Sequence, residues 1–258
     1  MLKRIATALL IITPAFVQAD AIDLSSWSEL TLDYDGGQSA GDWVLAADNE
    51  SVKQVINADP SFYLNNLNQT SYTMDGTWKV ETSSDDDYMG FVFGYQNSSN
   101  FYLFDWKQGT QSYVGTTANE GMTIKKMTGA TGDGLVDLSL AEFWENTTDF
   151  GDMDVLATNH GSDKGWLDNR EYTFHLDFNL NPGEFHINIK DGETELWDVV
   201  VTDSTFTSGQ FGFYNYSQAN VRYAGFEQTG GVIVDVPEPA TLVILASGLL
   251  GFGFARRK

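Results

Sequence analysis

Residues 174–197 read FHLDFNLNPGEFHINIKDGETELW, and this stretch decides the fold class. Apolar residues alternate with polar ones over 174–180, and the alternation resumes over 185–189 after the turn sequence NPGE at 181–184. A second turn, DG, follows at 191–192. Period-two alternation interrupted by turn residues predicts an antiparallel β-meander with one buried face.

Three further segments have the composition of strands. Residues 88–95 and 101–107 are aromatic-rich runs on either side of the polar turn 96–100, and residues 211–216 form a late aromatic run. Residues 118–158 are less regular, and we expect long loops there with one short helical turn. The chain is therefore predicted to be all-β, one antiparallel two-sheet sandwich, and it has no cysteine that could form a disulfide.

The N-terminus has the three parts of a secretory signal peptide. Two basic residues at positions 3–4 precede an apolar run that ends in Val17-Gln18-Ala19, a sequence suited to signal peptidase. We predict cleavage after Ala19, with Ala21 as the alternative, so that residues 1–19 are removed. A transmembrane helix is the competing interpretation, but Pro14 interrupts the run, which is also too short to span a bilayer.

Residues 236–258 carry a second export signal, in which a Pro-Glu-Pro triplet precedes an apolar run over 240–254 and a terminal basic cluster. The residues that define it are Pro237, Glu238, Pro239, Arg256, Arg257 and Lys258. These parts, in this order, resemble the PEP-CTERM sorting signal of Gram-negative bacteria. The resemblance implies that exosortase removes the tail, after its short hydrophobic helix has inserted transiently in the inner membrane with the basic cluster on the cytoplasmic side. A permanent anchor is the alternative, although the apolar run is short for a bilayer.

The charge of the exported part excludes two classes of partner. The chain has 14 Lys plus Arg and 36 Asp plus Glu. Five of the basic residues and one of the acidic residues lie in the terminal signals, which leaves residues 20–236 with 9 basic and 35 acidic residues, a net charge of −26. Such a domain repels nucleic acid and anionic membranes, and it favours multivalent cations.

The centre of the chain resembles a known extracellular family. Residues 84–96 read SDDDYMGFVFGYQ and residues 101–108 read FYLFDWKQ, and both resemble the thrombospondin C-terminal domain. Supporting agreement follows in the same order at residues 43–45, 55–60, 165–168, 209–213 and 216–218. The resemblance implies a lectin-like jelly-roll sandwich over 42–235, after a lead-in over 20–41, that binds calcium and serves adhesion or matrix assembly rather than catalysis.

One departure from the animal members of that family limits the partners that the resemblance implies. Asn100 stands where they often have a basic residue in a segment linked to receptor binding. Animal receptors are therefore not expected as partners. An extracellular polysaccharide or a matrix protein is the expected partner instead.

Asp85, Asp86 and Asp87 are the best candidates for metal ligands. Calcium prefers several hard oxygen ligands from loops, and adjacent carboxylates repel one another until a cation binds. A solvated acidic turn explains the same residues without a metal, whereas the resemblance implies calcium. Asp42, Asp105 and Asp168 lie in the matched segments and are further candidates, although no spacing rule selects among them.

Catalytic and zinc sites have less support in the sequence. Glu193 and Glu195 would project from one side of a strand, as a glycosidase pair requires, but a solvent-facing edge strand gives the same pattern. His175 and His186 lie on the polar faces of paired strands, where they could face each other, and His160 adds no metal-ligand spacing. Without a third ligand these histidines do not define a zinc site.

The 7 tryptophans leave a second function open, because aromatic rings stack on sugars. Trp43, Trp78 and Trp106 lie in apolar strand contexts and are predicted to be core residues, whereas Trp144, Trp166 and Trp197 are less clearly placed. The sequence thus predicts an exported, non-enzymatic, calcium-binding sandwich, secreted or held at the cell surface by way of the inner membrane and periplasm. A carbohydrate-binding or carbohydrate-cleaving sandwich is the alternative.

Overall fold

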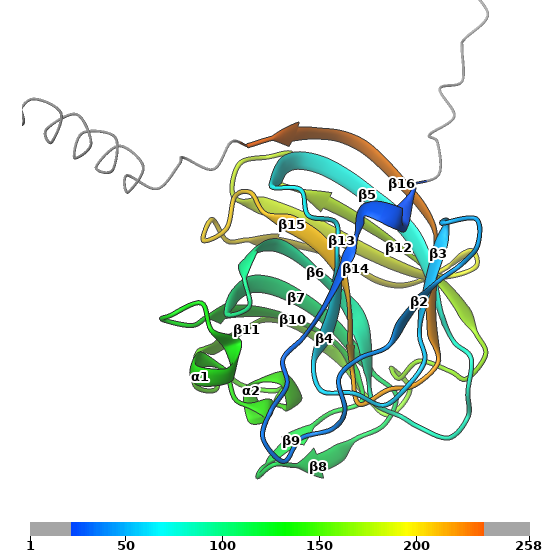
Figure 1. Cartoon of the computed structure of the whole chain (residues 1–258), viewed down its shortest axis with the longest axis vertical. Helices are drawn as coiled ribbons and strands as arrows, with labels where there is room; N and C mark the ends of the chain where they lie inside the picture. The colour runs from blue at the N-terminus through cyan, green and yellow to red at the C-terminus, as the bar shows by residue number, and fades with distance from the viewer. Residues whose placement is uncertain (1–21, 235–258) are drawn as a thin grey trace, which may run out of the picture.

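The computed structural model describes residues 22–234, so both terminal signals, with the predicted signal segment and hydrophobic tail helix, lie outside the described residues. Two seven-stranded antiparallel sheets pack face to face (Figure 1). Sheet I contains, in spatial order, β1 (Ser28–Thr31), β4 (Ser61–Leu64), β15 (Gln210–Tyr216), β6 (Tyr88–Asn97), β7 (Asn100–Lys107), β10 (Gly121–Thr128) and β11 (Met153–His160). Sheet II contains β14 (Thr194–Thr202), β13 (Glu184–Asp191), β12 (Glu171–Phe178), β5 (Gln69–Val80), β16 (Val221–Ile233), β3 (Ser51–Gln54) and β2 (Trp43–Leu45).

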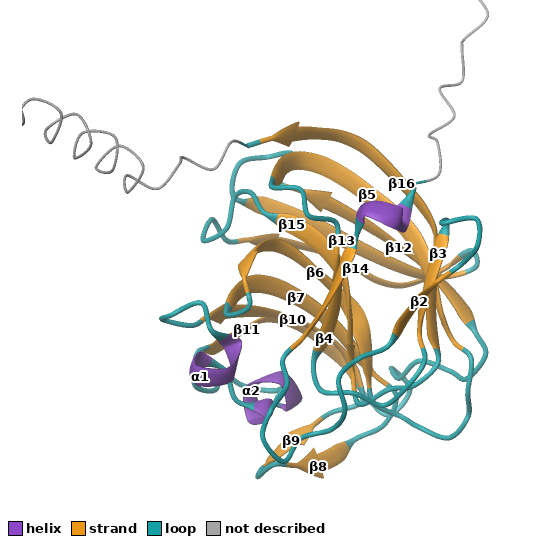
Figure 2. Cartoon of the chain, viewed as in Figure 1, coloured by secondary structure: helices purple, strands orange, loops and turns teal. Residues whose placement is uncertain are grey.

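The remaining elements are short. They are a hairpin of β8 (Gln111–Tyr113) and β9 (Thr116–Ala118), a 3₁₀ turn η1 (Leu24–Ser26), and the helices α1 (Gly134–Asp137) and α2 (Leu140–Trp144). Figure 2 shows both α-helices on one side of the molecule, next to sheet I. The all-β sandwich predicted from the sequence is therefore confirmed for the described residues.

The predicted meander is present as β12, β13 and β14, which pair in chain order at one edge of sheet II. Its first turn closes when Glu184 N–H donates to the Asn181 carbonyl at 2.9 Å. Gly183 adopts φ +77°, a conformation that a residue with a Cβ rarely tolerates. The aromatic runs 88–95 and 101–107 likewise form the antiparallel neighbours β6 and β7.

The main core lies between the two sheets and is largely aromatic. Phe91 from sheet I lies 5.0 Å from Phe174 of sheet II, measured between ring centroids. Trp78 of sheet II stacks on Phe174 and also on Phe104 of sheet I, with centroids 5.0 Å and 5.7 Å apart. Trp43, Trp78 and Trp106 are all buried, so their prediction as core residues is confirmed.

A second core covers the other face of sheet I. Tyr88, Val92 and Leu103 of that face pack with Phe143 and Trp144 of α2. Sheet I is therefore buried on both faces, whereas polar side chains of β5, β12 and β13 line a hollow on the outer face of sheet II. This asymmetry determines the environment of every charged side chain discussed below.

The expectation of long loops over 118–158 was wrong in part. The segment contains β10 and most of β11, two strands of sheet I, besides the helical turns. Lys125 interrupts the apolar alternation of β10, yet its side chain is completely buried because it pairs with a buried carboxylate. A charged residue at a core-facing position thus concealed the strand.

The predicted lead-in over 20–41 contributes to the sandwich. β1 pairs with β4 at the edge of sheet I, and Trp27 stacks on Phe213 with ring centroids 5.2 Å apart. Leu24 is completely buried in the main core. The chain therefore enters the sandwich well before residue 42.

Candidate metal centres

The three predicted aspartates converge in the turn that enters β6. Asp85, Asp86 and Asp87 each offer a carboxylate oxygen within 4.8 Å of the others. Asp87 is buried, and the other two are partly exposed. Partial burial raises the pKa of Asp85 to about 6 against an opposing hydrogen bond from Asn57, and the charge of Asp87 adds to the increase. The turn therefore concentrates negative charge that a cation would stabilise.

Lys107 already neutralises part of that charge. Its ammonium group lies 2.7 Å from Asp87 Oδ1 and 3.8 Å from Asp86 Oδ1, and it donates to the Asp86 carbonyl at 3.1 Å. The Lys107 side chain is fully buried, 4.6 Å from the ring centroid of Trp144. Asp87 is consequently held from the protein side, whereas the carboxylates of Asp85 and Asp86 are the ones open to solvent.

Asp105 belongs to a buried charge row, defined as Asp87, Lys107, Asp105 and Lys125. These side chains lie on the covered face of sheet I, where Lys125 Nζ is 2.7 Å from Asp105 Oδ2 and donates to the Phe143 carbonyl at 2.7 Å. Burial raises the pKa of Asp105, and it lowers that of Lys125. The row links sheet I to the segment that covers it.

The other two predicted aspartates lie apart from the turn. Asp42 is exposed beside β2, and Asp168 is an exposed residue whose Oδ1 accepts a hydrogen bond from Gln108 at 3.2 Å. Within residues 22–234, neither of these nor Asp105 joins the three-carboxylate group. The structure thus brings together Asp85, Asp86 and Asp87 but not the rest of the predicted set.

A second convergent group lies on the outer face of sheet II, where the sequence indicated the two histidines but not the aspartates beside them. We call Asp75, His175, Asp177, His186 and Asp198 the His–Asp array. His175, Asp177 and His186 offer ligand atoms within 4.8 Å of one another. The two histidines are diagonal neighbours, because His175 pairs with Asn188 and His186 pairs with Asp177. Asp177 supplies the third potential ligand atom that the sequence pattern of the two histidines lacked, and its position two residues after His175 was the available signal.

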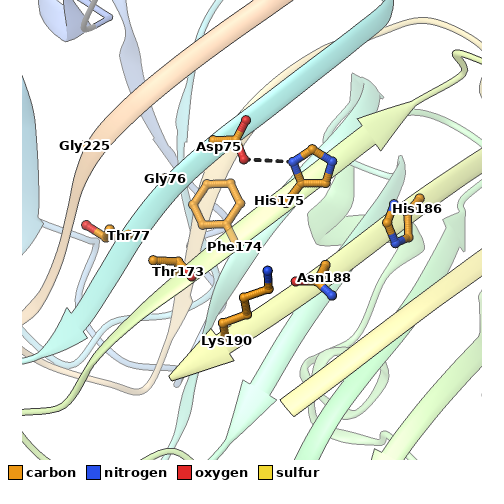
Figure 3. A pocket seen from close by; sticks show the side chains of 10 residues that line it. All are labelled: Asp75, Gly76, Thr77, Thr173, Phe174, His175, His186, Asn188, Lys190 and Gly225. Atoms are coloured by element: carbon orange, nitrogen blue, oxygen red, sulfur yellow. Dashed lines mark hydrogen bonds and ion pairs between the residues drawn. The ribbon is translucent and has the colours of Figure 1, made fainter. Parts of the chain in front are cut away.

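The array lies at a hollow of about 520 Å³ (Figure 3). Side chains from β5, β12 and β13 line it, and Figure 3 shows His175 bonded to Asp75 on the neighbouring strand. Asn188 and Lys190 extend the polar lining along β13. The hollow is therefore open and bordered by both histidines.

The residues considered for carbohydrate binding or cleavage lie in several different parts of the fold. Glu193 lies in the exposed turn between β13 and β14, and Glu195 accepts a hydrogen bond from Asn188 at 3.1 Å. All seven tryptophans lie in the described range, six of them buried, including Trp144 and Trp166, and Trp197 half-buried. Six of the seven indole rings are therefore not available for stacking on a sugar, and Trp197 is the one that is partly exposed.

The third histidine is not part of either group. His160, on β11, lies with Nε2 2.9 Å from Thr123 Oγ1, and burial lowers its pKa. Among the described residues, none of the helices is long and apolar enough to cross a membrane. The residues of both predicted export signals lie outside the described range.

Comparison with known families gives two matches. The family described as the thrombospondin C-terminal region matches residues 38–229, and the PEP-CTERM protein-sorting motif matches residues 235–258. Thrombospondin-3b of Danio rerio is 31% identical over 206 residues, which cover 77% of this chain and 22% of that protein. Human cartilage oligomeric matrix protein is 29% identical over 220 residues, covering 83% of this chain and 29% of that protein. The chain thus spans less than a third of the length of these relatives.

A solved structure agrees with the fold. A carbohydrate-binding module from Bacillus subtilis superposes with a TM-score of 0.50 at 14% identity, covering 80% of this chain and 96% of that one. At this identity the likeness concerns the fold alone. Both sequence resemblances, to the sandwich family and to the sorting signal, are confirmed by these matches.

Proposed function

We propose, on the premise that this chain belongs to the thrombospondin C-terminal family, that it is an exported, non-enzymatic, calcium-binding module for adhesion or matrix assembly. The PEP-CTERM motif supports its export and its passage through signal peptidase and exosortase to the cell surface or matrix. The expected partner is an extracellular polysaccharide or a matrix protein.

The observation that supports calcium is the turn at Asp85, Asp86 and Asp87. Three carboxylates converge there and one ammonium group, that of Lys107, faces them, so a net negative charge is held in a partly buried loop. Hard oxygen donors of this kind suit Ca²⁺, which also accepts backbone carbonyls and waters. A calcium ion between Asp85 and Asp86 would fix the entry to β6 without displacing Lys107 from Asp87.

The test is a set of thermal melts of the full chain in calcium and in chelator. Calcium at a hundredfold excess over its Kd stabilises a folded-state site by about 2.7 kcal/mol. The variant Asp85→Asn with Asp86→Asn should lose this shift and keep the Asp87–Lys107 pair. The control is Asp33→Asn with Asp35→Asn, which removes the same charge from exposed positions. An equal calcium shift in both double variants would refute the assignment.

Adhesion and the carbohydrate alternative are separated by a binding and a turnover assay. Binding of the exported protein to isolated extracellular matrix should depend on calcium and weaken in the Asp85→Asn, Asp86→Asn variant. A non-enzymatic module should release no reducing ends from a polysaccharide panel. Hydrolysis that is abolished by Glu195→Gln would instead establish the carbohydrate-cleaving function.

Processing is tested on protein recovered from the native cell surface. Intact mass should correspond to a chain that has lost residues 1–19 and the apolar tail after Pro237-Glu238-Pro239. Retention of residues 240–258 would show that the tail serves as a permanent anchor.

A further inference from the structure

We propose that His175, Asp177 and His186 form a second metal site, for a divalent transition ion such as Zn²⁺, on the outer face of sheet II. This site is independent of the calcium proposal, because it uses different residues on the opposite sheet. Imidazole nitrogen favours zinc and its neighbours in the transition series, whereas calcium takes oxygen ligands.

Each inner histidine nitrogen lies near Asp177 at a distance close to that between two ligand atoms of a tetrahedral ion. With zinc–nitrogen and zinc–oxygen bonds of about 2.0–2.1 Å, ligand atoms at tetrahedral angles lie roughly 3.3–3.4 Å apart. His175 Nε2 is 3.2 Å from Asp177 Oδ1, and His186 Nδ1 is 3.5 Å from Asp177 Oδ2. These two contacts end on different oxygens of Asp177, so the side chains must move for one ion to bind among the three groups, whose ligand atoms lie within 4.8 Å of one another.

The outer ring nitrogens provide a second, independent observation. His175 Nδ1 is 2.8 Å from Asp75 Oδ1, and His186 Nε2 is hydrogen-bonded to Asp198. Each imidazole thus has a carboxylate on the nitrogen that faces away from Asp177. Metal-binding histidines commonly donate their other ring N–H to a carboxylate, a backbone carbonyl or water, which fixes the tautomer and leaves the second nitrogen free to bind the ion.

The charges of the array favour a cation at its centre. If the outer nitrogens of His175 and His186 carry their protons, the inner nitrogens present lone pairs to the oxygens of Asp177. That contact is repulsive unless protons or a metal ion lie between the atoms. If one divalent ion replaces the two protons of a pair of imidazolium groups, the net charge of the array does not change.

The surroundings leave room for a fourth ligand. His175, His186 and Asp177 are each about a third exposed or less, and the two histidines border the hollow of about 520 Å³. A site with three protein ligands and an open position holds water or an incoming donor group. The proposed ion would therefore be accessible from solvent rather than sealed inside the sandwich.

The experiment is a zinc titration of the chelator-treated full chain that carries Asp85→Asn and Asp86→Asn, so that the calcium turn is absent. Equilibrium dialysis should show one Zn²⁺ per chain, and Ca²⁺ should not compete. Asp177→Asn or His186→Gln should abolish this stoichiometric binding. Asp198→Asn, which removes only an outer partner, should weaken it by about 10- to 100-fold.

The matched control is His160→Gln, which removes the remaining histidine on the other sheet. Its zinc affinity should equal that of the parent, and circular dichroism in chelator should show that every variant is folded. Co²⁺ in place of Zn²⁺ should give the visible absorption of a tetrahedral site. Absence of zinc binding, or binding that survives both Asp177→Asn and His186→Gln, would overturn the proposal. The calcium turn would remain untouched by that result.

Discussion

The buried charge row of sheet I and the His–Asp array of sheet II use similar chemistry in opposite environments. In the row, the Lys125–Asp105 pair is completely removed from water. In the array, the side chains of His175 and Asp75 are 34% and 46% exposed. The difference arises because α2 and its flanking loops cover sheet I, while the outer face of sheet II has a hollow that is open to solvent. Burial by neighbouring segments, rather than residue type, thus decides whether charged side chains form a buried ion pair that holds two segments together or a solvent-accessible candidate ligand site.

The largest expected effect comes from breaking the buried pair. Lys125→Met leaves the Asp105 carboxylate without its partner in a site that excludes water, and it removes the donor to the Phe143 carbonyl. We expect a loss of about 3–5 kcal/mol in the free energy of unfolding, measured by urea denaturation.

Two further variants sharpen that measurement. Adding Asp105→Leu to Lys125→Met should recover much of the loss, because no unpaired charge remains. Lys126→Met, on the same strand, affects ion pairs to Asp154 and Asp203 that are nearer to solvent, and it should cost only about 1 kcal/mol. Equal losses of unfolding free energy in Lys125→Met and Lys126→Met would contradict the idea that the fully buried ion pair matters more to stability than the partly exposed ones.

The next largest effect is expected for Lys107, which belongs to the buried charge row and also contacts the proposed calcium turn. Lys107→Met removes the ammonium group that faces Asp86 and Asp87, and we expect a loss of about 2–3 kcal/mol in chelator. Calcium should recover more stability in this variant than in the parent, since the carboxylates then lack their internal counter-ion. Thermal melts in both conditions measure the difference, and an unchanged calcium shift would separate Lys107 from the proposed site.

A smaller effect should follow from pH in the metal-free array. The hydrogen bond to Asp75 raises the pKa of His175 to about 9 from 6.5, with support from the charge of Asp177 and against partial burial. A raised pKa means that the stabilisation is complete below pH 6.5 and is lost as pH rises through 9. Solvent screening reduces it to about 1 kcal/mol.

Urea denaturation at pH 6 and pH 10, in chelator, measures this contribution. The loss between the two pH values should be larger in the parent than in His175→Gln, because only the parent has the Asp75–His175 pair. Identical pH dependence in the two proteins would show that the Asp75–His175 pair contributes nothing to stability.

The smallest expected effect is that of Asp198→Asn on metal-free stability. Its carboxylate is 47% exposed and bonded only at the outer edge of the array, so the free energy of unfolding should change by less than about 1 kcal/mol. Urea denaturation in chelator checks this. A loss of several kcal/mol in the free energy of unfolding would mean that the array stabilises the fold as the buried charge row does.

Local patterns in the sequence determined much of this protein. The alternation over 174–189 is a property of adjacent residues, and it predicted the β12–β13 pair and the turn between them. The aromatic runs predicted β6 and β7, and the turn at Asp85, Asp86 and Asp87 is visible as three consecutive letters. Such features are readable because one strand face repeats every second residue.

Only the tertiary structure decided the rest. β10 was concealed because Lys125 is tolerated in the core only when Asp105, from another strand, neutralises it. Asp177 joins the two histidines because the register of β12 and β13 places it opposite His186. Trp144 is buried because its segment folds back over sheet I. Strand pairing, strand register and the packing of α2 over sheet I bring together residues that are distant in the chain. The free energy of each such contact depends on how much of its surface is buried from water, and a local sequence pattern does not contain that information.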